Sequence, residues 1–364
     1  MTSLHETIDA LFDRAARELE AKTAAFDPNN FCLLGAGNMG RAALAQFRQI
    51  GVEPRGFIDD TPGKRGTTIE GLPVFGERPD PSTTVIVCIH NPRHDYLKTL
   101  QRFGPNTLSF MHIPWLFPQL TFAHAAHPDV YRRYRDDILA LYEALADETS
   151  RRTFLEQLTF RLTLEWNFEE HSATPYFPDG IGLPFEEKVS FIDAGAFDGD
   201  TVKLFVEHFP RPGKIIAIEA DPQNFAKLRA YLAALGIDHV AHHAAVDGKE
   251  GELRFDATGD MAARLSETGQ VVVRCHTLEH FMKDVDGPCY VKFDVEGAES
   301  AIITESQELL REKKPMLAVS VYHHAPDMIE IPLQLHRLGY RLSMRYHGID
   351  GADLVLYAMP GEPH

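Results

Sequence analysis

The chain has 364 residues, and its 36 basic and 53 acidic side chains give a formal net charge of −17. No run rich in lysine and arginine offsets this charge, so we expect no nucleic-acid partner, and an acidic substrate would need a local basic patch. Hydrophobic residues make up 44% and charged residues 24%, which is typical of a globular protein, and the length allows two or three domains.

The N-terminal segment, residues 1–28, predicts one amphipathic helix. Its run SLHETIDALFDRAARELEAK places Ser3 and Glu6 at the spacing of a capping box. The segment lacks the pattern of a signal peptide, and no apolar run in the chain reaches 18 residues. The four cysteines have no CxxC or zinc spacing, which is typical of reduced, buried thiols. We therefore expect a cytoplasmic protein with no membrane span.

Residues 29–115 alternate between apolar runs and helical patterns. An apolar run at 31–35 leads into the turn GAGNMG and then into the helical pattern RAALAQFRQI. Further strand-like runs follow at 54–60, 84–92 and 107–114. This order predicts a small Rossmann-like domain with a parallel sheet.

The turn GAGNMG leaves several functions open. With Asp59 standing 24 residues after Gly35, it satisfies the dinucleotide fingerprint, which permits NAD binding. The longer run GAGNMGRAALAQF…GFIDDTPGKRGTTIEGLPVFG resembles the nucleotide-sugar-binding domains of sugar acyltransferases and sugar-modifying enzymes. A purely structural or dimerising role is the third interpretation.

The nucleotide-sugar resemblance implies a set of ligand contacts. A pyrophosphate would lie at the helix N-terminus, and Asp59 or Asp60 would take a sugar or ribose hydroxyl. Arg41, Lys64 and Arg65 would supply the local positive charge. The substrate-binding candidates in this domain are Gly35, Gly37, Asn38, Met39, Gly40 and Asp59.

Residues 116–186 are aromatic-rich and mostly helical, and their spacing shows no chemistry. We interpret them as a helical segment that joins two domains. They end in the proline-broken run TPYFPDGIGLP, and we expect its Tyr176 and Phe177 to cover a ligand site in the following domain.

From residue 187 to 364 strands and helices alternate again. The last two apolar runs, YRLSMRYHG and DLVLYAMP, predict an antiparallel hairpin at the edge of a sheet. The whole chain is thus an α/β protein with two Rossmann-like domains, at 29–115 and 187–364.

The C-terminal domain opens on a second glycine-rich turn, FIDAGAFDGD. Its glycines, Gly195 and Gly199, are four residues apart, and Asp193 precedes the first by two. Glu219 ends the next strand, 26 residues after Asp193, where a carboxylate can bind both hydroxyls of a ribose. The chain has no GxxxxGK[ST] phosphate loop, so these residues indicate an adenosine ligand without phosphates.

These motifs resemble the class I S-adenosylmethionine-dependent methyltransferases, and more closely the FkbM family. The family patterns D-x-G-A-x-x-G-D, E-x-x-P and K-x-D-V-E-G-A-E correspond here to DAGAFDGD, EADP and KFDVEGAE, in that order. The resemblance spans 189–359. It departs from the family at Phe197, where a smaller or polar residue is usual, and at Glu279, where aspartate is common.

The resemblance implies a mostly parallel seven-stranded sheet with an antiparallel edge strand, and S-adenosylmethionine as the cofactor. In this interpretation Asp193 supports the turn and accepts hydrogen bonds from an ammonium group. The implied cofactor-binding residues are Asp193, Gly195, Ala196, Gly199, Asp200, Thr201, Glu219, Ala220, Asp221 and Asp294.

Methyl transfer to a hydroxyl needs a group that removes the proton of the hydroxyl. Asp294, His323 and His324 follow neighbouring strands at the edge where ligands of such sheets bind, and all three are candidate catalytic residues. We favour His323, because the turn toward Pro326 should begin at His324 and because imidazole titrates near neutral pH. A metal-assisted route through Asp294 and Glu296 is open, but the spacing does not demand a metal, and we predict none.

The sequence therefore predicts a methyltransferase of the FkbM type that O-methylates a sugar hydroxyl in a nucleotide sugar or glycan intermediate. Glu296 is a further substrate-binding candidate, and the acceptor is a small molecule or glycan. The alternatives are an NAD-dependent oxidoreductase that uses GAGNMG and a non-catalytic protein that binds both ligands. A homodimer is compatible with the sequence.

Overall fold

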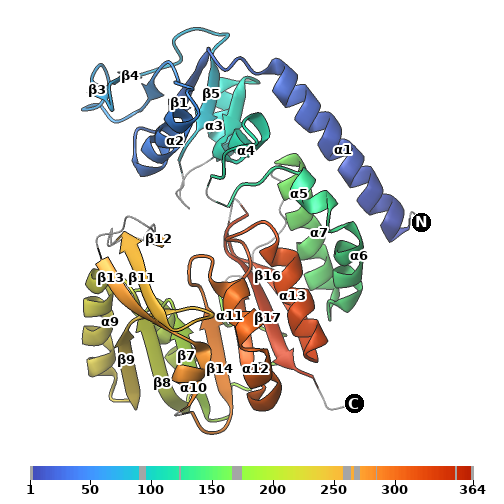
Figure 1. Ribbon diagram of the computed structural model, residues 1–364, viewed down its shortest axis with the longest axis vertical. Helices are drawn as coiled ribbons and strands as arrows, with labels where there is room; N and C mark the ends of the chain where they lie inside the picture. Colours follow the sequence, from blue (N-terminus) through green and yellow to red (C-terminus); the bar gives the residue numbers. More distant parts are fainter. Residues whose placement is uncertain are drawn as a thin grey trace. The chain divides into compact units, whose positions relative to one another are not determined.

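The computed structural model describes residues 3–89, 96–122, 124–165, 174–256, 264–265, 271–283, 285–348 and 351–361 (Figure 1). The chain divides into two units. The N-terminal unit comprises Met1–Arg133 and Leu158–Asn167, and the C-terminal unit comprises Tyr134–Gln157 and Phe168–His364.

The N-terminal unit begins with helix α1 (Leu4–Ala25). The predicted capping box is confirmed, because Ser3 Oγ accepts from the Glu6 N–H and Glu6 Oε2 accepts from the Ser3 N–H. These bonds satisfy N–H groups that no helical carbonyl can reach.

A six-stranded sheet forms the core of this unit, in the order β3-β4-β2-β1-β5-β6. All neighbouring strands are parallel except β3 and β4. The strands are β1 (Phe31–Leu34), β2 (Phe57–Ile58), β3 (Thr68–Ile69), β4 (Leu72–Phe75), β5 (Thr84–Val87) and β6 (Thr107–Ser109). The helices that follow β1 and β5 are α2 (Asn38–Gln49) and α3 (Tyr96–Phe103). Apolar side chains of β1, β2, β5 and α3 form one buried cluster.

The segment that we expected to join two domains contributes helices to both units. It contains α5 (Asp129–Arg132) in the N-terminal unit, α6 (Arg135–Ala144) in the C-terminal unit, and α7 (Glu148–Thr163), which extends across the division. Two short helices, η1 (Phe110–His112) and α4 (Ile113–Leu116), precede it.

The C-terminal unit is built on a seven-stranded sheet in the order β16-β17-β15-β14-β7-β8-β9. Its strands are β7 (Val189–Ala194), β8 (Pro212–Glu219), β9 (His239–His243), β14 (Cys289–Phe293), β15 (Met316–Ser320), β16 (Tyr340–Tyr346) and β17 (Leu354–Pro360). The predicted hairpin is present, but the strand that runs against the others is β17, which pairs with β15 and β16. The antiparallel strand is therefore one place in from the edge, not the edge strand that we predicted.

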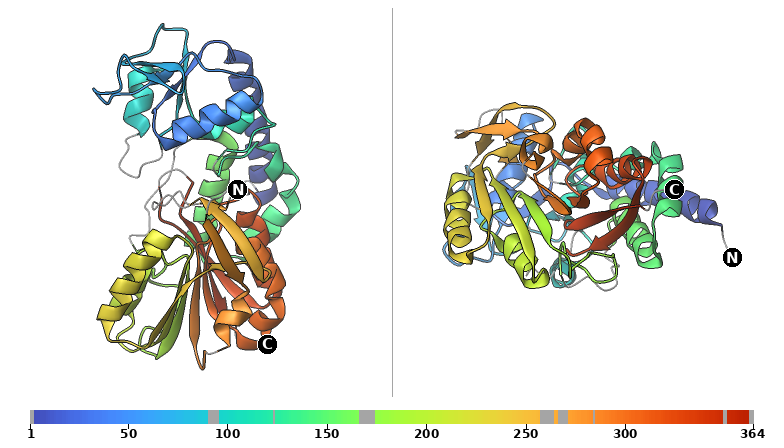
Figure 2. Two further views of the ribbon diagram at one scale, coloured as in Figure 1. Left: turned by 60° about the vertical axis from the view of Figure 1, so that its left-hand side comes forward. Right: turned by 90° about the horizontal axis from the view of Figure 1, so that it is seen from below.

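Helices cover both faces of this sheet, with α8 and α9 on one face and α11 to α13 on the other (Figure 2). They are α8 (Asp200–His208), α9 (Pro222–Leu235), α11 (Glu299–Glu305), α12 (Gln307–Lys313) and α13 (Asp327–Arg337). Side chains such as Phe191, Phe205 and Leu232 are fully buried between the sheet and α8 and α9.

A smaller sheet lies between β9 and β14 in the sequence, in the order β10-β13-β11-β12, and the sequence pattern did not indicate it. It contains β10 (Ala245–Val246), β11 (Gly251–Asp256), β12 (Arg264–Leu265) and β13 (Val271–His276), and helix α10 (Leu278–Met282) follows it. None of the helices in the described ranges has the length and apolar composition needed to cross a bilayer. The four cysteines are buried, and no disulfide joins them.

Candidate active site

The turn between β7 and α8 requires glycine at two positions. Gly195 and Gly199 have φ of +83° and +98°, which side chains with a Cβ rarely adopt. A Cβ at Gly195 would lie 1.9 Å from the carbonyl oxygen of Asp294. The N–H groups of Gly195 and Ala196 both donate to the carbonyl of Ile218, at 3.0 and 2.9 Å. The turn is thus held against the carboxyl ends of β8 and β14.

A buried lysine on β14, Lys292, holds this turn in place. Lys292 Nζ donates to the carbonyl of Gly195 at 2.6 Å and lies 3.2 Å from Asp193 Oδ1. Both side chains are buried, with exposed fractions of 3% and 0%. Burial raises the pKa of Asp193 to about 6 against the field of Lys292. Burial alone would lower the pKa of Lys292, but Asp193, Asp294 and Asp200 outweigh it and raise that pKa.

This pairing changes the interpretation of Asp193. We expected it to accept hydrogen bonds from an ammonium group, and the ammonium that the structure places on it is that of Lys292. Lys292 stands in β14 (CYVKF), whose four other residues are apolar or aromatic, and all five residues are buried. A lone charge at such a position indicates a buried partner of opposite charge. This pattern in the sequence could have predicted the pair.

Glu219 lies at the end of β8 and is fixed to the same turn. Its Oε2 accepts from the Phe197 N–H at 2.8 Å, and its Oε1 accepts from the Asp221 N–H at 2.6 Å. Burial raises the pKa of Glu219 to about 7, although these two hydrogen bonds act in the opposite direction. The carboxylate is thus oriented by the backbone, and each oxygen keeps one further acceptor position.

Other predicted cofactor residues have local roles. Asp221 caps α9 by accepting from the N–H groups of Gln223 and Asn224, at 2.8 and 2.9 Å. Asp200 Oδ1 accepts from the N–H of Thr201 at 2.7 Å at the start of α8. The Ala220 carbonyl lies 3.1 Å from His243 Nε2.

Asp294 follows β14 and lies among hydroxyl groups. Tyr176 donates its hydroxyl to Asp294 Oδ2 at 3.0 Å, and Tyr322 lies 3.5 Å from Oδ1. Burial would raise the pKa of Asp294, but Lys292 and His323 outweigh it and lower that pKa. Burial also raises the pKa of both tyrosines well above the usual value. Asp294 is therefore ionised at neutral pH, and the tyrosines keep their protons.

Three non-glycine residues here have φ in the left-handed region: Tyr176 (66°), Phe197 (47°) and Glu296 (57°). For bulky side chains this conformation is costly and persists only where surrounding contacts impose it. Phe197, which departs from the family pattern, is held in this conformation with its N–H donating to Glu219 Oε2.

His323 lies among three carboxylates. Its Nδ1 is 3.0 Å from Glu299 Oε1, and its Nε2 is 3.6 Å from Asp294 Oδ1 and 3.9 Å from Glu296 Oε2. Burial alone would lower the pKa of His323, but Glu299, Asp294 and Glu296 raise it to about 10. His323 therefore carries a proton at neutral pH and would have to lose it before it could act as the predicted base.

His324 has a different position. It is exposed, and its N–H donates to Asp327 Oδ2 at 2.9 Å. Its ring lies against Gly297, where a Cβ would come within 2.4 Å of Nε2. His323, not His324, forms the ion pair with Asp294.

The family model of the FkbM methyltransferase domain matches residues 193–342, from Asp193 through β14 and β15 to β16. The chain carries an FkbM methyltransferase domain. The match covers 150 of the 364 residues and supports methyltransferase activity for this domain. The turn, Glu219, Asp294 and His323 all lie inside the matched range.

Comparison with solved structures extends the likeness of fold beyond the FkbM domain. A crystal structure of methyltransferase FkbM from Methylobacillus flagellatus KT superposes with a TM-score of 0.73 at 20% identity, over 96% of this chain and 100% of that one. Precorrin-6y C5,15-methyltransferase from Geobacter metallireducens GS-15 gives 0.31 at 13% identity, over 48% and 82%. Fibrillarin from Aeropyrum pernix, with natively bound S-adenosyl-L-methionine, gives 0.31 at 15%, over 49% and 70%. No curated protein sequence matches the chain.

The FkbM domain also offers a metal-binding geometry. Asp294, Glu299 and His323 place potential ligand atoms within 4.8 Å of one another. Glu299 meanwhile accepts from the N–H groups of Val295 and Gly297, at 2.8 and 3.0 Å, and so shapes the loop after β14. The metal-assisted route left open by the sequence ran through Asp294 and Glu296, whereas the structure groups Asp294 with Glu299 and His323.

In the N-terminal unit the three glycines of GAGNMG differ in what requires them. Gly35 has φ +104°, and a Cβ at Gly40 would lie 1.9 Å from the Gly35 carbonyl oxygen. Gly37 has φ −94° and is exposed, and a Cβ at this position would have no other atom within 4 Å. Folding thus requires Gly35 and Gly40. At Gly37 the backbone has open space around it, immediately before the start of α2 at the exposed Asn38 and the half-buried Met39.

Asp59 is buried and braces this first turn. Its Oδ2 accepts from the Ala36 N–H at 2.9 Å and from Lys64 Nζ at 3.0 Å, and its Oδ1 accepts from the Thr61 N–H at 2.9 Å. Burial would raise its pKa, but these hydrogen bonds lower it well below the usual range. Arg65 and Arg102 pair with Asp60. The expected sugar-binding carboxylates therefore already have partners within the unit.

Proposed function

We propose that the FkbM domain uses S-adenosylmethionine to methylate a hydroxyl of a sugar, in a nucleotide sugar or a glycan intermediate. One observation carries the proposal: Glu219 Oε2 accepts from the Phe197 N–H, so the ribose-binding carboxylate and the glycine turn form one structure. The FkbM match favours methyl transfer over the NAD-dependent oxidoreductase alternative.

The residues at this edge suit an adenosine with a sulfonium side chain. Gly195 keeps the turn free of a side chain, and Glu219 offers oriented acceptor positions for two ribose hydroxyls. When bound, S-adenosylmethionine supplies a methyl group on an already activated leaving group. The protein must then mainly hold the acceptor hydroxyl in line with that methyl group.

Asp294 is the residue that we propose accepts the acceptor's proton. It is ionised, and Tyr176 and Tyr322 fix its orientation by their hydroxyl groups. His323 is a positioning residue, because its positive charge lies 3.6 Å from Asp294 and Glu299 holds its other ring nitrogen. The Lys292–Asp193 pair positions the turn.

Glu219→Ala is expected to weaken S-adenosylmethionine binding by about 10–100-fold, because hydrogen bonds to a charged group contribute about 1.5–3 kcal/mol. Calorimetry against S-adenosylmethionine and its demethylated product measures this. Glu219→Gln keeps the shape, and Glu187→Ala on an exposed loop is the matched control. Unchanged donor affinity in Glu219→Ala would show that the donor site is elsewhere.

Gly37→Val is expected to abolish sugar-nucleotide binding and leave donor affinity intact. Valine can adopt φ −94° and meets no neighbour, so the unit should fold, but its side chain would block close approach of a phosphate to the backbone. Gly63→Val is the control, because that exposed glycine also has open space around it. The measurement is calorimetry with UDP- and GDP-sugars. A wild-type protein that binds neither these nor NAD would leave this unit with a structural role.

A further inference from the structure

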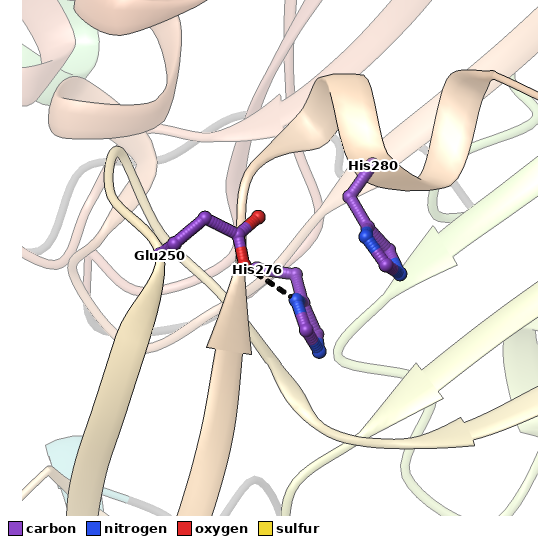
Figure 3. A group of neighbouring side chains, drawn as sticks. All are labelled: Glu250, His276 and His280. Carbon is purple, nitrogen blue, oxygen red and sulfur yellow. Dashed lines mark hydrogen bonds and ion pairs between the residues drawn. The ribbon is translucent and has the colours of Figure 1, made fainter.

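A second group of metal-ligating side chains gathers where β11, β13 and α10 meet, outside the Asp294 group. Figure 3 shows its members: the carboxylate of Glu250 lies beside the ring of His276, and the ring of His280 is stacked on that of His276. Their potential ligand atoms all lie within 4.8 Å of one another. Neither the family resemblance nor the proposed methyl transfer uses these residues.

The register of the small sheet brings Glu250 and His276 together. Gly251 of β11 pairs with Cys275 of β13, so the preceding Glu250 stands opposite His276. Glu250 Oε2 lies 2.7 Å from His276 Nδ1, and Oε1 accepts from the Thr277 N–H at 3.0 Å. These contacts fix the carboxylate beside the ring.

Helix α10 adds the third side chain. His280 follows His276 by four residues, and the two rings stack with centroids 4.1 Å apart and planes 14° apart. Phe281 contacts both rings from one side, at centroid distances of 5.9 and 5.1 Å. The ring centroid of His242 on β9 lies 6.4 Å from the ring centroid of His280. The two imidazoles are therefore stacked next to the ring of Phe281.

We propose that Glu250, His276 and His280 bind one divalent late transition-metal ion, of which Zn²⁺ is the natural example. Two imidazole nitrogens and a carboxylate oxygen are the donors that such ions select, and Mg²⁺ or Ca²⁺ would prefer oxygen alone. Bonds of about 2.1 Å at the tetrahedral angle place ligand atoms about 3.4 Å apart. Closing from 4.8 Å or less requires these partly exposed side chains to rotate until one nitrogen of each stacked ring points at the ion.

The ion would join the end of β13, the residue before β11 and the first turn of α10. A ligand that binds only the folded state stabilises it in proportion to the logarithm of its concentration over its Kd. The metal therefore has a structural role in the small sheet, independent of methyl transfer.

The test uses tag-free, full-length protein that has been stripped with a chelator and dialysed. Co²⁺ is titrated and its visible absorption recorded, and Zn²⁺ is titrated by calorimetry. We expect one ion per chain, and a loss of affinity of at least about 10–100-fold in His276→Ala and in His280→Ala, since removing even an outer-sphere partner costs that much. Zn²⁺ should raise the Tm of wild type but not of these variants.

Three further variants make the result specific. His239→Ala is the control, because His239 lies on β9 and its Nδ1 contacts the Ile237 carbonyl. Glu250→Gln should also weaken binding of the ion, although the amide oxygen of the glutamine can still accept from the Thr277 N–H. If Co²⁺ does not bind, if His276→Ala and His280→Ala bind as wild type does, or if only His323→Ala loses the ion, the proposal is wrong. If only His323→Ala loses the ion, the ion is bound by Asp294, Glu299 and His323 instead.

Discussion

Asp294→Asn is expected to lower kcat by about 10²–10⁴-fold, the usual cost of removing a general base, with donor affinity within a few-fold of wild type. Asparagine keeps the shape of the side chain and an acceptor for the Tyr176 hydroxyl, but it cannot take a proton. The measurement is single-turnover methyl transfer from labelled S-adenosylmethionine to an acceptor found by screening sugars and nucleotide sugars. Near-wild-type turnover in this variant would remove Asp294 from the role of base.

The pH profile separates Asp294 from His323. If His323 were the base, its pKa of about 10 would make kcat rise about tenfold for each pH unit between 7 and 10. Because the pKa of Asp294 is lowered, an Asp294 base stays ionised at neutral pH, and kcat should be flat there and fall only toward acid. His323→Gln should then reduce kcat less than Asp294→Asn does. Loss of wild-type activity in EDTA, restored by a divalent ion, would instead indicate a metal held by Asp294, Glu299 and His323.

Lys292→Met is expected to lower the free energy of unfolding by about 3–5 kcal/mol, because it leaves Asp193 buried without a countercharge. It should also release the Gly195 carbonyl and so abolish measurable donor binding. Urea unfolding followed by circular dichroism measures the first effect, and calorimetry measures the second. The exposed Lys203→Met on α8 is the matched control.

The double variant Asp193→Asn/Lys292→Met tests the cause of this loss. Neutralising both partners removes the uncompensated charge, so the double variant should be more stable than Lys292→Met alone. A double variant that is no more stable than Lys292→Met would show that the lysine acts through packing and not through its charge.

The strand-end positions of the site could be predicted from sequence, because parallel strands bring their carboxyl ends to one edge. Gly195, Glu219 and Asp294 follow buried apolar runs, and the pairing of β7 with β8 and β14 brings them together as that rule predicts. The charge states could not be predicted in the same way. The proton on His323 depends on Glu299, a residue 24 positions earlier whose carboxylate is oriented by the loop after β14.

The smaller sheet was missed for a related reason. β10 and β12 are two residues long, too short to show alternation, and β13 (VVVRCH) does not alternate in sequence, so only β11 (GELRFD) shows the pattern of a strand. The pairing of Glu250 with His276 follows from the register of β11 on β13, which no local pattern contains. The edge strand was assigned wrongly because the hairpin pattern gives the pairing of β16 with β17 but not which of them pairs with β15.

The interior place of β17 bears on how the protein folds. β17 follows β15 and β16 in the sequence, yet it lies between them in the sheet. Until β17 is inserted, β15 and β16 have no partner on their facing edges, and each exposes unpaired N–H and C=O groups. A folding intermediate without β17 in place is therefore open to association with other chains, and the insertion of this one strand covers both of these edges.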